Sequence, residues 1–131
     1  MSMPNMKTDW TENDYYNAED LNRVGNAVTW LTERLTDYGY ICVTTPKTNW
    51  TEKDEPVLYQ MQQYIAEVAA VKTAFYSALP LPESVRFLTA EGANEIERML
   101  IDTEILIQAM ERVFLRSNAA ESNGLNLWIV N

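Results

Sequence analysis

The chain has 131 residues, of which 47% are hydrophobic and 22% are charged, a balance typical of one globular domain. Asp and Glu outnumber Lys and Arg by 19 to 10, and the resulting formal charge of −9 argues against nucleic acid or an anionic membrane as a partner. Histidine is absent, which excludes Ser-His-Asp and Cys-His nucleophiles, His-ligated zinc and the Glu-x-x-His di-iron motif.

Three further features concern the cellular compartment. Cys42 is the only cysteine and cannot form an internal disulfide, which is typical of a reducing cytoplasm. The first residues, M-S-M-P-N-M, have no apolar core and predict no secretory signal. No apolar run approaches the ~20 residues that span a bilayer.

An internal repeat begins just after a short N-terminal stretch, residues 1–6, that we expect to be flexible. Residues 7–14, K-T-D-W-T-E-N-D, and 47–54, K-T-N-W-T-E-K-D, are identical at six of eight positions. In each copy a Thr and an Asp three residues later (Thr11 and Asp14, Thr51 and Asp54) fit a capped turn. Capping explains every shared residue except the Lys.

Each copy therefore predicts a rigid corner that directs the chain into a following helix. We expect the Trp10 ring to pack against Tyr15 as a hydrophobic staple. The alternative is that Trp10 and Trp50 are exposed anchors for a protein partner, because aromatic residues dominate interface energetics. The sequence leaves both interpretations open.

The first loop–helix module covers residues 7–39. Asn17, with Asp20 three residues on, predicts the start of its helix, and Gly39 predicts the stop. Apolar residues recur at helical spacing between them: Leu21, Val24, Val28, Leu31, Leu35 and Tyr38. Residues 40–44, Y-I-C-V-T, predict a brief strand in the connection that follows.

The second module covers residues 47–79. Its helix is expected to begin near Pro56, which is favoured in a first helical turn, and to end before Pro80. Its apolar stripe comprises Met61, Tyr64, Val68, Val71, Phe75 and Leu79.

A third helix is predicted over residues 89–116, with Thr89 as its N-cap. Its start, A-E-G-A-N-E-I (90–96), echoes A-E-D-L-N-R-V (18–24) in the first helix. Its apolar face is the widest of the three, so we expect it to be sandwiched by both other helices or buried against another subunit through residues such as Ile107. The sequence thus predicts a mainly α, three-helix bundle built from a duplicated module, within one helical domain, 1–131.

Residues 117–131 are interpreted as a C-terminal extension. Asn123-Gly124 predicts a turn, and residues 125–130, which include Trp128, predict an extended segment. Docking within the same fold is favoured, either against residues 40–44 or flat on the bundle through Trp128. Addition to another protein's sheet edge is the alternative.

Three polar residues near the start of the first helix form a candidate binding group: Asn22, Arg23 and Asn26. The third helix repeats the pattern with Asn94 and Arg98. We expect the amides to tie the Trp corner onto its helix. Gly25 lies among them and predicts the close approach of another group, such as a Tyr or Trp of the corner.

No catalytic, metal or cofactor site is predicted. The paired acids of the third helix (Glu91 with Glu95, and Glu97 with Asp102 or Glu104) are expected on its solvated face. Asp9, Glu12 and Asp14 lack the D-x-[DN]-x-[DN]-G pattern of a calcium loop, and no Gly-rich phosphate loop is present. We therefore expect no enzyme. The alternative is a carboxylate-dependent enzyme or a small-ligand-binding helical domain.

The string K-T-D-W-T-E-N-D-Y-Y-N-A-E-D-L-N-R-V (7–24), its second copy at 47–54 and A-N-E-I-E-R (93–98) resemble small tail-associated structural proteins of phages and prophages of Gram-positive bacteria. Helical modules in that family open with a Trp-Asp corner and an Asn-Arg-Ile helix, and the resemblance covers residues 7–107. This chain departs from the pattern at Val24 and Gly25, and at Gln62-Gln63-Tyr64.

The resemblance implies a virion or tail-assembly component without catalytic residues. Its expected partners are proteins, either further copies of the chain or other tail components. Its expected location is the cytoplasm during assembly and the virion afterwards.

Overall fold

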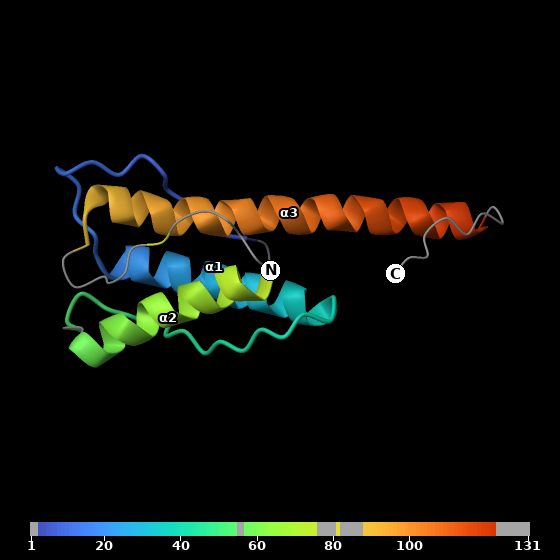
Figure 1. The fold of residues 1–131 in the computed structure, drawn as a ribbon. Helices are drawn as coiled ribbons and strands as arrows, with labels where there is room; N and C mark the ends of the chain where they lie inside the picture. The colour runs from blue at the N-terminus through green and yellow to red at the C-terminus, as the bar shows by residue number, and fades with distance from the viewer. Residues whose placement is uncertain (1–2, 55–56, 76–80, 82–87, 123–131) are drawn as a thin grey trace.

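Three α-helices run in the same direction and pack against one another in the computed structural model (Figure 1). They are α1 (Ala18–Asp37), α2 (Leu58–Phe75) and α3 (Ala90–Ser122). The structure describes residues 3–54, 57–75, 81 and 88–122, except for the side chains of residues 58 and 114–122. The predicted mainly α, three-helix bundle is confirmed.

Local capping determines where two of the helices begin. Asn17 Oδ1 accepts a hydrogen bond from the Glu19 amide at 3.1 Å, and Asp20 Oδ2 accepts one from the Asn17 amide at 2.8 Å. At α3, Thr89 Oγ1 accepts from the Gly92 amide at 3.0 Å. These bonds satisfy amides that have no partner within a helix, so the predicted starts of α1 and α3 are confirmed.

The end of α1 is also local in origin. Tyr38 is the C-cap, and Gly39 follows with φ of +88°, a conformation that glycine adopts without steric cost. α3 continues beyond residue 116 to Ser122 through Asn118-Ala119-Ala120-Glu121, where Ala and Glu favour helix. The predicted end of the second helix at Leu79 and the extension with Trp128 lie outside the described residues.

The core lies where the inner faces of the three helices meet. Its largest members are essentially inaccessible to solvent: Leu31, Leu35, Val68, Val71, Ile96, Met99, Leu100 and Ile107. Ile107 therefore belongs to the chain's own core: of the two expectations for this face, sandwiching by the other helices holds at Ile107, and burial against another subunit does not. Among the described side chains of α3, the exposed large apolar ones are instead Ile105, Leu106 and Val113.

Parallel helices require the chain to return along the bundle between them, and residues 40–50 do so beside α1 and α2 (Figure 1). Their exposure alternates: Cys42 and Trp50 are buried, whereas Ile41 and Val43 are 91% and 82% exposed. The structure has no strand at 40–44, contrary to prediction, because no second strand lies beside this segment within the described residues. Helix side chains contact it instead, as in the 2.7 Å hydrogen bond between the Thr32 and Thr44 hydroxyls.

In the described part of the chain, no helix is both long enough and apolar enough to cross a membrane.

Gly25 allows the return segment to lie directly against α1. A Cβ atom at this position would come within 2.8 Å of the Lys47 carbonyl oxygen and 3.1 Å of Thr48 Cγ2. Close approach was predicted here, but the group that approaches is backbone and not an aromatic ring.

We predict that Gly25→Ala destabilises the protein by about 1–3 kcal/mol, although alanine is the better helix former, because the return segment must move away. Urea unfolding measures the change, with Thr36→Ala at an exposed position of α1 as the control. An unfolding free energy equal to or above that of the wild type would contradict the close packing.

Candidate functional site

Each Trp corner is a short turn closed by its own Thr and Asp. Asp14 Oδ2 accepts from the Thr11 amide at 2.8 Å, and Asp54 Oδ2 accepts from the Thr51 amide at 2.7 Å. In both turns the Asp amide donates to the Thr carbonyl at 3.0 Å. The predicted capped turns are confirmed, and the two copies have the same geometry.

One asparagine side chain fixes the backbone of each tryptophan. Asn94 Oδ1 accepts from the Trp10 amide at 2.8 Å, and Asn94 Nδ2 donates to the Trp10 carbonyl at 3.2 Å. Asn22 pairs in the same way with Trp50, at 2.8 and 2.9 Å. A carboxamide thus takes the place that a neighbouring strand would have in a sheet.

The pairing corrects one expectation about these amides. Each corner is held by a different helix from the one it precedes: the first corner docks on α3, and the second docks on α1. No hydrogen bond to either corner is described for Asn26, whose predicted role is therefore not supported. The corners consequently join helices that are distant in sequence.

Both tryptophan rings are buried, with Trp10 7% and Trp50 8% exposed. The Trp10 ring packs against Tyr16, with centroids 5.0 Å apart, whereas Tyr15 is 88% exposed. The predicted staple to Tyr15 was wrong, since Tyr15 points outward as the chain turns toward α1. The alternative, that Trp10 and Trp50 are exposed anchors for a partner, was also wrong.

The repeated lysine, which capping did not explain, lies over the tryptophan ring. Lys7 Nζ is 4.9 Å from the centre of the Trp10 ring, and Lys47 Nζ is 5.0 Å from that of Trp50. The ring face attracts a cation at this range.

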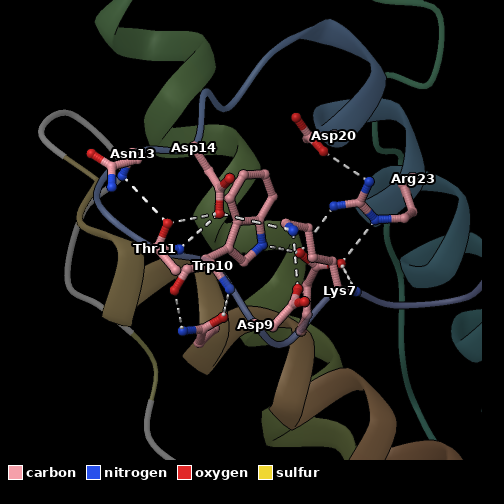
Figure 2. A network of polar contacts seen from close by, with 10 residues as sticks. Lys7, Asp9, Trp10, Thr11, Asn13, Asp14, Asp20 and Arg23 are labelled. Atoms are coloured by element: carbon pink, nitrogen blue, oxygen red, sulfur yellow. Dashed lines mark hydrogen bonds and ion pairs between the residues drawn. The ribbon is translucent and has the colours of Figure 1, made fainter.

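A buried carboxylate completes the first corner (Figure 2). Glu97 is fully buried and accepts hydrogen bonds from the Lys7 amide at 2.8 Å and from Trp10 Nε1 at 2.7 Å. Arg23 binds both carboxylate oxygens, through Nε at 2.9 Å and Nη2 at 3.0 Å, and donates to Asp20 at 2.8 Å. Glu97 was expected on a solvated face, so this expectation was wrong.

Arg23 keeps its positive charge at this site. Burial works against that charge, but the hydrogen bonds and charges of Glu97 and Asp20 outweigh burial, so the pKa of Arg23 lies above its usual value. Four donors of the chain itself, two of them from Arg23, occupy the carboxylate oxygens of Glu97.

The second corner lacks this ion pair. The 40-residue offset between the two copies aligns Arg23 of α1 with Gln63 of α2. The match of residues 18–24 with 90–96 aligns Glu97 of α3 with Gly25 of α1, the helix that holds the second corner. A different carboxylate, Glu67 of α2, lies nearby, accepts from the Thr45 amide at 3.0 Å and is 6% exposed.

A hydrogen bond joins a tyrosine that follows the first corner to a tyrosine of α2. The hydroxyls of Tyr16 and Tyr64 bond to each other, and burial raises the pKa of both. Both hydroxyls therefore stay neutral at physiological pH and serve to join the first corner to α2.

Glu91 and Glu97 of α3 lie in different surroundings. Glu91 is exposed and pairs with Arg98 at 2.8 Å, whereas Glu97 faces the core on a different side of the helix. Within the described residues, no group of three or more Asp, Glu or Cys side chains could hold a metal ion.

Sequence reasoning missed the two buried glutamates. For Glu97 a signal was present, because it continues the stripe of Ala93, Ile96 and Leu100 at helical spacing. A carboxylate at a core position indicates a buried partner of opposite charge. The same signal was present for Glu67, which lies three residues after Tyr64 and four before Val71 in the apolar stripe of α2.

No known protein family matches the chain, and neither does any curated protein or solved structure.

We predict that Glu97→Gln lowers the free energy of unfolding by about 3 kcal/mol, because it leaves Arg23 without its buried counter-charge. Glu91→Gln on the same helix is the matched control and should cost less than about 1 kcal/mol, since its ion pair is exposed. Equal losses of unfolding free energy in urea would show that the buried ion pair contributes no more to stability than the exposed one.

The two tryptophans provide a second matched comparison. Phe substitution removes similar ring area at both corners, but only Trp10 loses a bond to a carboxylate, because no acceptor is described for Trp50 Nε1. Trp10→Phe should therefore cost about 2 kcal/mol more than Trp50→Phe. A difference near zero in thermal or urea unfolding would contradict the assigned bond.

Proposed function

We propose that this chain is a non-enzymatic structural component that binds other proteins, as part of a phage or prophage tail or virion assembly. The resemblance of its two Trp corners to those of tail-associated proteins supports the assignment to a tail or virion. The observation that carries the proposal is that the distinctive polar residues, Asn22, Arg23, Asn94 and Glu97, bind the chain's own backbone and side chains.

A carboxylate-dependent enzyme receives less support. General acid–base chemistry needs carboxyl groups that face a substrate site with separated pKa values. Glu97 has four donors from its own chain, and Glu91 lies on the surface with Arg98. A bundle whose Asn22, Asn94 and Glu97 side chains bind the chain itself is better suited to holding partners in place than to turnover.

The proposed partners are further copies of the chain or other tail components. Exposed apolar side chains mark two surfaces that such partners could cover. The first consists of Ile41 and Val43 on the return segment, and the second consists of Ile105, Leu106 and Val113 on α3. These surfaces replace Ile107 as the proposed contact.

The experiment is to induce prophage in the bacterium that encodes the chain and to analyse purified particles by quantitative mass spectrometry. We expect the chain at a fixed ratio to known tail proteins, whereas a cytoplasmic enzyme of the same prophage should be absent. Absence of the chain from particles and from tail-assembly intermediates would refute the proposal.

A further inference from the structure

The first corner contains a cation that the second corner lacks. At the first corner the Arg23 guanidinium pairs with buried Glu97, and its central carbon lies 5.9 Å from the centre of the Trp10 ring. At the second corner the corresponding residue is Gln63, which carries no charge. The lysines do not account for this difference, because Lys7 and Lys47 occupy equivalent places over the two rings.

A buried carboxylate is nevertheless present at the second corner. Glu67 accepts from the Thr45 amide at 3.0 Å, from Thr45 Oγ1 at 3.5 Å and from Gln63 Nε2 at 2.7 Å. All three donors are uncharged, and none of the ion pairs found among the described residues includes Glu67. A buried carboxylate whose donors are neutral carries a desolvation cost that a bound cation would offset.

A cavity of about 130 Å³ adjoins this carboxylate, between α1, α2 and the return segment. Its lining includes Lys47, Trp50, Tyr59, Gln63, Tyr64 and Glu67, and Lys47 lies over the Trp50 ring as Lys7 lies over Trp10, where Arg23 is also present. Tyr59 is 71% exposed and lies at the solvent side, whereas Trp50 and Glu67 are both more than nine-tenths buried. Aromatic faces beside a carboxylate form a type of site that binds organic cations.

We propose that this cavity binds a guanidinium group, which pairs with Glu67 and stacks on the aromatic lining as Arg23 does at the first corner. A guanidinium fits better than an ammonium because it is planar, binds a carboxylate through two N–H groups and is weakly hydrated. The group comes either from an arginine of a partner protein or from a free guanidino compound. The proposal does not depend on the tail assignment.

Methylguanidinium is the probe, and the uncharged methylurea, of the same shape, is its control. Each is titrated into the ¹⁵N-labelled full chain while the four indole N–H resonances are followed, that of Trp50 being assigned by its loss in Trp50→Phe. We expect a saturable shift of the Trp50 resonance with methylguanidinium and none with methylurea.

Two variants locate the site. Glu67→Gln keeps the shape of the side chain and removes its charge, so it should weaken binding about tenfold or more, whereas Glu91→Gln should leave binding unchanged. Gln63→Arg supplies the missing guanidinium from within the chain, so it should abolish the shift and raise Tm. This second variant keeps the test decisive even if Glu67→Gln does not fold.

The source of the guanidinium is decided by comparing methylguanidinium with a capped Gly-Arg-Gly peptide. Tighter binding of the peptide indicates a partner's arginine, and equal or weaker binding indicates a free small molecule. The proposal is overturned if the wild type shows no saturable shift at Trp50, if methylurea binds equally well, or if Gln63→Arg leaves binding intact.

Discussion

Within the described residues, neither the N-terminal residues 7–10 nor the return segment, residues 40–50, has a neighbouring strand, so helix side chains supply hydrogen bonds to their backbone. Parallel helices make the return segment unavoidable, because the chain has to travel the length of the bundle before α2 begins. Asn94 and Asn22 each supply one donor and one acceptor to a tryptophan, and Glu97 and Glu67 each accept one amide. Without these partners the amides would be buried at a cost of about 1–3 kcal/mol each.

The two corners show how a duplicated module can diverge while its backbone geometry is kept. At the first corner a charged network joins α1, α3 and the N-terminal segment. At the second, Gly25 removes the carboxylate and lets the chain approach α1, which replaces electrostatic contact with close packing. A cavity lies beside Gly25 and Trp50 at the second corner.

The sequence was sufficient where the determinants are local. The caps at Asn17 and Thr89, the stop at Gly39 and the turns at Thr11 and Thr51 each involve residues within a few positions of one another. The docking of Trp10 on Asn94 joins residues 84 positions apart, and nothing in the local pattern specifies which helix receives the corner. Helical periodicity also placed Glu97 at a core position. The assumption that acidic side chains face solvent led to the wrong prediction.

Amide hydrogen exchange of the full chain tests most directly whether helix side chains hold the two Trp corners. The account predicts that the Trp10 and Trp50 amides are protected to a degree comparable with the cores of α1 and α3, although neither residue lies in regular secondary structure. Asp9 and Asn49, adjacent to them and exposed, should exchange much faster. Trp10 and Trp50 amides that exchange at the rate of their exposed neighbours would contradict the account.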